Sequence, residues 1–156
     1  MIPAGTVHAI GAGVLLAEIQ QMSDATFRVF DWNRVGPDGK PRQLHIEQAL
    51  ESTDFEAGPV SPFITEPIPI ESGTRELLPH CPFFSLERYK INRPIGLGDP
   101  ERFTIVMALE GSAEIEDAGG ATTPLGFGET VLLPASVGVV QVRPHGSTTL
   151  ITCVVP

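Results

Sequence analysis

The stretch that decides the fold is Phe103-Thr-Ile-Val-Met-Ala-Leu-Glu-Gly-Ser-Ala-Glu-Ile-Glu116. It contains two strand-like runs, Phe103–Leu109 and Ala113–Glu116, separated by turn residues at Glu110-Gly111. Short runs rich in β-branched and apolar residues, bounded by glycine, are typical of β-strands joined by tight turns. The stretch therefore predicts two consecutive strands, and the same pattern continues on both sides of it.

Four more strand-like runs surround this pair, and glycine-rich turns lie at Gly119-Gly120 and Gly126-Phe-Gly128. The runs are Phe83–Ile91, Glu129–Leu133, Val139–Val142 and Thr148–Val155. Strands repeated at this spacing predict an all-β, antiparallel barrel or jelly roll over residues 75–156. Phe83, Phe84 and Phe103 are expected in its core.

The first half of the chain has a different pattern. Residues 1–35 contain two strand-like runs, 13–20 and 25–30, with a Ser-Asp turn between them, and predict a β-hairpin. Residues 36–74 are predicted to be a connecting segment. It includes a short helix over Leu44–Leu50 and then a proline-rich stretch expected to form an extended connection or an edge strand.

Composition restricts the possible functions. Fifteen prolines and sixteen glycines in 156 residues disfavour long helices, while 42% apolar residues are enough for a core. A net charge of −9 argues against nucleic acid and anionic membranes as partners, so an anionic substrate needs a local positive site. The sequence has only two cysteines, no signal peptide with a basic region followed by an apolar run, and no long apolar stretch. These features predict a cytoplasmic protein.

Four segments carry a resemblance to a known family. They are Ile2-Pro-Ala-Gly-Thr-Val-His8-Ala9, Glu18-Ile-Gln-Gln-Met-Ser-Asp24, Arg28-Val-Phe-Asp-Trp-Asn-Arg34 and Gly39-Lys-Pro-Arg-Gln-Leu-His-Ile-Glu-Gln-Ala-Leu50. In this order they resemble the signature region of the type I mannose-6-phosphate isomerases. The resemblance implies a C-terminal portion of such an enzyme: a cupin-type double-stranded β-helix preceded by a β-hairpin from an incomplete first cupin.

The activity that the resemblance implies is the reversible conversion of mannose 6-phosphate into fructose 6-phosphate. A proton moves between C1 and C2 through a cis-enediol, and zinc orients or polarises substrate oxygens. The alternative is a non-catalytic cupin module with a structural or sugar-binding role. An iron-dependent oxygenase is disfavoured because its two-histidine, one-carboxylate ligand set is not found in the sequence.

The resemblance also suggests roles for three residues. His8 matches a zinc ligand of the family, and Arg28 matches an active-site arginine that stabilises charge or binds phosphate. If paired residue numbers in the hairpin sum to 46, Glu18 lies opposite Arg28. That pair is either a cross-strand ion pair of small energetic value or a functional pair, in which Glu18 orients a hydroxyl or moves a proton.

Other candidates have equally plausible structural explanations. Arg34 and Arg42 either assist phosphate binding or have structural roles. His45, in the predicted helix, is expected to be a surface or packing residue, and Trp32 to be a core residue.

In the family, Gln, His and Glu ligands precede the motif that contains His8, and Met1 lies only seven residues before His8. We therefore expect three of the four zinc ligands to be outside this chain, which is either a truncated product or a genuine short relative. One imidazole does not hold zinc stably, so whether the chain alone is an enzyme is open. The strands over 13–30 would have unpaired edges, which predicts a homodimer through them.

Overall fold

The computed structural model describes residues 1–23 and 25–156, which form two compact units, Met1–Pro62 and Phe63–Pro156. We refer to them as unit 1 and unit 2. The division into 1–35, 36–74 and 75–156 remains a prediction, and the structure separates the chain at Pro62–Phe63. No helix among the described residues has both the length and the apolar composition needed to cross a bilayer.

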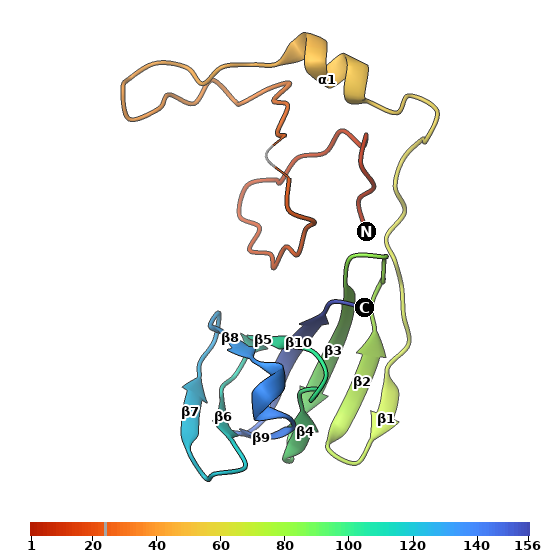
Figure 1. Cartoon of the computed structure of the whole chain (residues 1–156). Helices are drawn as coiled ribbons and strands as arrows, with labels where there is room; N and C mark the ends of the chain where they lie inside the picture. The colour runs from red at the N-terminus through yellow and green to blue at the C-terminus, as the bar shows by residue number, and fades with distance from the viewer. Residues whose placement is uncertain (24) are drawn as a thin grey trace. The chain divides into compact units, whose positions relative to one another are not determined.

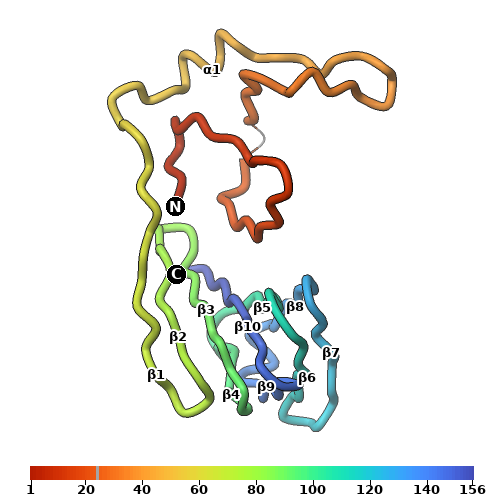
Figure 2. Tube along the Cα trace, turned by 180° about the vertical axis from the view of Figure 1, so that it is seen from behind, coloured from red at the N-terminus to blue at the C-terminus, as the bar shows by residue number. Residues whose placement is uncertain are grey.

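Unit 2 consists of two antiparallel sheets (Figures 1 and 2). The larger has the order β1-β2-β3-β10-β5-β8 and the smaller β4-β9-β6-β7. The strands are β1 Ile68–Ile70, β2 Gly73–Leu77, β3 Ser85–Ile91, β4 Ile95–Leu97, β5 Thr104–Glu110, β6 Ala113–Glu116, β7 Thr122–Leu125, β8 Thr130–Leu133, β9 Val140–Pro144 and β10 Thr148–Val154. A short 3₁₀ helix, η1, spans Ala135–Val137.

Strict alternation explains the burial of β5, β6 and β9, whereas β10 is buried at six consecutive positions. In β5, Thr104, Val106 and Ala108 are buried while their neighbours are more exposed, as expected for a strand with one face on a core. The turn after β5 uses Gly111 at a φ of 71°, where a Cβ atom would lie 2.6 Å from the carbonyl oxygen of Ser147. Only glycine fits this close approach without strain.

The core lies between the two sheets. Each sheet contributes six buried apolar side chains: Tyr89, Ile91, Val106, Ala108, Leu133 and Leu150 from the larger, and Leu97, Ala113, Ile115, Leu125, Val140 and Val142 from the smaller. The predicted all-β cupin barrel is therefore confirmed. All six predicted strands are present, with ends shifted by at most two residues. Strand β1 lies at the edge of the larger sheet and within the proline-rich stretch that was expected to form an extended connection or an edge strand. Strands β2, β4 and β7 were not predicted, because runs of three to five residues that include Pro or Gly give little periodic signal.

Three aromatic residues do not occupy the predicted core. Phe83 and Phe103 are 51% and 40% exposed, because each lies before its strand begins, and Phe103 is also out of phase with the buried residues of β5. Trp32 is 54% exposed and is likewise not a core residue. These three expectations were wrong.

Unit 1 contains little regular structure. Its helix, α1, spans Ile46–Ser52 and overlaps the predicted helix, and a single β-bridge joins Val35 and Pro41. The predicted hairpin is wrong for the described residues, since neither 13–20 nor 25–30 forms a strand; Asp24, in the predicted turn, lies outside the described residues. An isolated two-stranded hairpin is at best marginally stable in water. Here its apolar side chains, including Val14, Leu15 and Phe30, are exposed.

Candidate functional site

Arg28 is held by the segment that leads into α1. Its backbone N–H donates to Nδ1 of His45 at 3.3 Å, and its carbonyl oxygen accepts from the His45 backbone N–H at 2.8 Å. The guanidinium Nη1 donates to the carbonyl oxygen of Gln43 at 3.3 Å. The His45 ring also contacts Phe27, with 6.3 Å between ring centroids. His45 is therefore the packing residue that we expected, and it helps to position Arg28.

Asp31 is the centre of an arginine cluster that the sequence did not reveal. Its carboxylate is almost completely buried and accepts hydrogen bonds from Arg34 Nη2 and Arg42 Nε, each at 2.7 Å. Arg28 Nε lies 3.9 Å away. The Arg42 hydrogen bond lowers the pKa of Asp31 far below its ordinary value; burial opposes this and Arg34 adds to it. Both Arg34 and Arg42 thus have a structural partner.

The turn between Asp31 and Arg34 has an unusual backbone. Its central residues Trp32 and Asn33 have φ values of 49° and 55°, and the Arg34 N–H donates to the Asp31 carbonyl oxygen at 2.9 Å. A left-handed tryptophan costs about 1–3 kcal/mol and persists only where its surroundings hold it. The Asp31–Arg34 pair supplies that restraint, and the Arg34 guanidinium lies 5.7 Å from the Trp32 ring centroid. Such strain is concentrated at functional sites.

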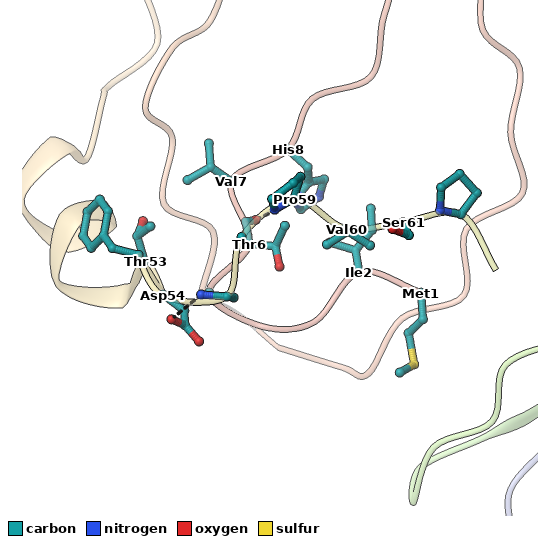
Figure 3. Close-up of a pocket in the computed structure, with 15 residues that line it drawn as sticks. Met1, Ile2, Thr6, Val7, His8, Thr53, Asp54, Pro59, Val60 and Ser61 are labelled. Atoms are coloured by element: carbon teal, nitrogen blue, oxygen red, sulfur yellow. Dashed lines mark hydrogen bonds between the residues drawn. The ribbon is translucent and has the colours of Figure 1, made fainter.

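His8 lies in an open cavity of about 650 Å³ formed within unit 1 (Figure 3). Thr6, Thr53 and Asp54 also line it, and the Asp54 N–H donates to the Gly5 carbonyl oxygen at 3.0 Å. His8 is exposed, and its Nδ1 is 2.9 Å from the carbonyl oxygen of Thr6. When Nδ1 carries the proton of this hydrogen bond, Nε2 is left with a lone pair, as a metal ligand requires.

A zinc site is not complete in these residues. Across 1–23 and 25–156, no three His, Cys, Asp or Glu side chains gather closely enough to hold a metal ion. Glu18 is exposed, and no hydrogen bond or ion pair of the described chain joins it to Arg28. Their predicted cross-strand pairing fails because the hairpin does not form. The structure thus brings together Arg28 and Asp31, but neither His8 nor Glu18 joins that cluster.

A second polar cluster, partly exposed, lies on strands β2 and β3 of unit 2. Arg75 on β2 donates through Nε to Oε2 of Glu87 on β3 at 3.0 Å, and its Nη2 donates to the other oxygen. The hydroxyl of Tyr89, a buried residue, also donates to Glu87. The sequence offered one signal that was missed: in β3, Glu87 and Tyr89 alternate in phase with the buried Ile91.

The environment of this cluster stabilises its charges. Burial is the largest single influence on Glu87 and acts to raise its pKa, but the hydrogen bonds from Arg75 and Tyr89 together hold the pKa below its ordinary value. Burial, followed by the hydrogen bond to Glu87, raises the pKa of Tyr89. The phenol therefore remains protonated and the carboxylate remains ionised at neutral pH.

Comparison with known proteins assigns the family. The family model described as "Mannose-6-phosphate isomerase, cupin domain" matches residues 74–154, which are more than half of the chain. The putative mannose-6-phosphate isomerase YvyI of Bacillus subtilis is 34% identical over 96% of this chain and 46% of its own length. Mannose-6-phosphate isomerase ManA of the same organism is 31% identical over 88% of this chain and 43% of its own.

A solved structure agrees with these relatives. The crystal structure of the mannose 6-phosphate isomerase from Bacillus subtilis matches 84% of this chain with a TM-score of 0.69 and 29% identity, and 40% of that chain is covered. The present chain thus spans less than half the length of the curated relatives it matches. It belongs to the mannose-6-phosphate isomerase family, in which it corresponds to a portion containing the C-terminal cupin.

Proposed function

We propose that this chain is the C-terminal part of an enzyme that interconverts mannose 6-phosphate and fructose 6-phosphate, and that it is inactive alone. The observation that carries the proposal is the match to mannose-6-phosphate isomerases along 96% of this chain. That match includes unit 1, which contains His8, Glu18 and Arg28, as well as the barrel.

Arg28 has the properties that the reaction needs from a charge-stabilising group. Moving a proton between C1 and C2 of a sugar places negative charge on oxygen, and a fixed guanidinium stabilises that charge most strongly when it is already oriented. The contacts with Gln43, His45 and Asp31 orient Arg28. Glu18 is proposed to orient a substrate hydroxyl or to move the proton.

Zinc dependence is part of the same proposal, with His8 as one ligand. Zinc would supply Lewis-acid polarisation of substrate oxygens. The described residues do not by themselves fit a zinc site, because a catalytic centre usually has three protein ligands. We therefore propose that zinc binds only when protein outside these 156 residues completes the ligand set.

The test is a hybrid in which this chain replaces the matched segment of the Bacillus subtilis ManA protein. We expect the hybrid to bind zinc and isomerise mannose 6-phosphate, and the 156-residue chain alone to do neither. In the hybrid, Arg28→Ala should lower kcat by about a hundredfold or more, and His8→Ala should remove zinc. The matched control, Arg143→Ala, changes an exposed arginine on β9 and should leave kcat unchanged.

Two outcomes would contradict the proposal in different ways. Isomerase activity and stoichiometric zinc in the chain alone would disprove its inactivity. A folded, zinc-loaded hybrid without activity would instead favour the alternative, a non-catalytic cupin with a structural or sugar-binding role. The Arg75–Glu87–Tyr89 cluster is the observation that favours this alternative, since it places hydrogen-bonding groups that can meet a sugar on β2 and β3 of unit 2.

We also propose that the protein is cytoplasmic and that two copies associate through residues 13–30. Support for association comes from the apolar side chains that this segment exposes, among them Leu15 at 85% and Phe30 at 57%. Sedimentation velocity at micromolar concentration should give a dimer, which Leu15→Asp should dissociate. A compact monomer at all concentrations would disprove the association.

A further inference from the structure

Unit 2 contains a cavity whose lining includes none of the residues proposed for the isomerase reaction. Its volume is about 590 Å³, within the range of about 300–1,000 Å³ typical of small-molecule sites. Residues of strands β1, β2, β3 and β4 and of the β1–β2 and β3–β4 turns line it. Figure 1 shows both turns at the same end of the barrel. A hydrogen bond from the Asn92 N–H to the Ser72 carbonyl oxygen, at 3.0 Å, joins the β1–β2 and β3–β4 turns there.

Two guanidinium groups line this cavity, and they differ in their partners. Arg75 uses Nε and one Nη2 hydrogen on Glu87, so its remaining hydrogens can still donate. Arg93 is exposed and makes no ion pair with any of the described residues. All the N–H groups of its guanidinium are available to donate to a ligand.

The Glu87 contacts give Arg75 a defined position. The Arg75–Glu87 pair holds the guanidinium from one side, and the buried Tyr89 fixes Glu87 from the other. Preorganised donors of this kind lose little side-chain freedom when a ligand binds. The lining therefore contains one guanidinium in a defined position, that of Arg75, and one that is free to adjust to a ligand, that of Arg93.

The hydrogen-bond donors of the lining suit an anion that also carries hydroxyl groups. Arg75 and Arg93 contribute two positive charges, while Glu71 in the lining and Glu87, which is bound to Arg75, contribute two negative charges. The surroundings of the cavity are therefore neutral in a chain of net charge −9, and Arg93 is the cation without an ion-pair partner among the described residues. Arginine forks match phosphate oxygens bidentately, while the hydroxyl of Ser72 and the carboxylate of Glu71 suit sugar hydroxyls.

We propose that this cavity is a ligand site for a small phosphorylated sugar, with the phosphate on Arg93 and Arg75 and the hydroxyl groups toward Ser72 and Glu71. This inference does not depend on isomerase activity. Unit 2 carries the site by itself, so binding is measurable on a chain that does not catalyse the reaction.

Equilibrium dialysis of the 156-residue chain with mannose 6-phosphate, inorganic phosphate and mannose tests the proposal. We expect saturable binding of mannose 6-phosphate, weaker binding of phosphate and none of mannose. Arg93→Gln should weaken binding of mannose 6-phosphate by at least about tenfold, as expected when a hydrogen-bonded charge is lost. Lys90→Gln, which removes one exposed charge from β3, should change it less than about twofold.

Arg34→Gln distinguishes this cavity from the arginine cluster of unit 1. If Arg34→Gln abolishes binding and Arg93→Gln does not, the phosphate binds in unit 1 and the proposal is wrong. It is equally wrong if the parent chain shows no saturable binding up to millimolar ligand. Thermal melts of each variant that match the parent establish that a loss of binding is not a loss of fold.

Discussion

Units 1 and 2 are ordered by different kinds of interaction. Of the buried residues described, only Asp31 and Ala49 belong to unit 1, and all others belong to unit 2. Unit 2 derives its order from apolar burial between two sheets. Unit 1 derives its order from polar contacts, in which Arg28 meets His45 and Asp31 meets Arg34 and Arg42. Apolar burial is nearly independent of pH, whereas ion pairs are not, so the two units should respond differently to the same perturbation.

The largest expected effect is in the core of unit 2. Leu150 is completely buried on β10 between β3 and β5. Leu150→Ala should lower the free energy of unfolding by about 2–5 kcal/mol, because it removes buried methyl groups and leaves a cavity. Urea denaturation followed by circular dichroism measures the change. Leu50→Ala, at a side chain 56% exposed on α1 of unit 1, should change it by less than about 0.5 kcal/mol. If both variants lower the free energy of unfolding equally, the two units do not differ in their dependence on apolar burial.

A smaller effect is expected at Glu87, where unit 2 does depend on charge. Glu87→Gln should lower the free energy of unfolding at pH 7 by about 1–2 kcal/mol, between the values for exposed and fully buried pairs. Because the pKa of Glu87 is depressed in the folded state, its stabilisation is present above the ordinary glutamate pKa and is lost as the pH falls through the folded value. The variant should lose this part of the acid dependence, which denaturation at several pH values detects. Glu116→Gln, at an exposed pair with Arg143, is the control. If the free energy of unfolding of Glu87→Gln depends on pH as that of the parent does, the Arg75–Glu87 pair does not stabilise the barrel.

In unit 1 the expected effect is local. Asp31→Asn removes the carboxylate that Arg34 and Arg42 share, so hydrogen exchange at the Asp31–Arg34 turn should accelerate while the unfolding of unit 2 is unaffected. The depressed pKa of Asp31 means that its stabilisation is present at neutral pH and is lost only as the pH falls below about 3.9, the ordinary aspartate value. Asp38→Asn, at an exposed carboxylate that accepts from the Lys40 N–H, is the matched control. Unchanged exchange in Asp31→Asn would show that another interaction holds the turn.

The smallest effect concerns the two thiols of unit 2. Burial, and then the nearby Cys81, raises the pKa of Cys153, which is 8% exposed. Only the thiolate reacts with iodoacetamide, so at pH 8 we expect Cys81 to be labelled before Cys153. In urea the two should react at similar rates, and mass spectrometry distinguishes the sites. Faster labelling of Cys153 in the folded chain would mean that β10 opens more readily than the core suggests.

The sequence predicted the barrel well because its strands carry their own pattern. In β6, alternating burial coincides with alternating apolar residues, β5 is a continuous apolar run, and Gly111 marks the turn between them. The exposed positions of Phe83 and Phe103 could not be predicted in this way. Hydrophobicity alone does not tell where a strand begins, so it does not show that a phenylalanine one or two positions before the strand lies outside the core.

The candidate sites were only partly predictable. The motif residues His8, Glu18 and Arg28 were identified by resemblance, but their contacts were not. Asp31 went unnoticed although arginines lie three residues before and after it. In a segment without regular structure, that spacing does not predict which side chains meet. Only the folded structure shows that Arg34 and Arg42 bind the same carboxylate.

The amino-acid sequence alone was enough to predict an all-β barrel and membership of a sugar phosphate isomerase family. Both predictions rest on local patterns, namely short strand-like runs between turns and a dense motif. The tertiary structure decided which polar groups meet. Arg75 and Glu87 are 12 residues apart in sequence, and Arg42 and Asp31 are 11 apart. Pairing over such distances depends on strand register and loop path, which result from the burial of the whole unit and not from any short stretch of residues.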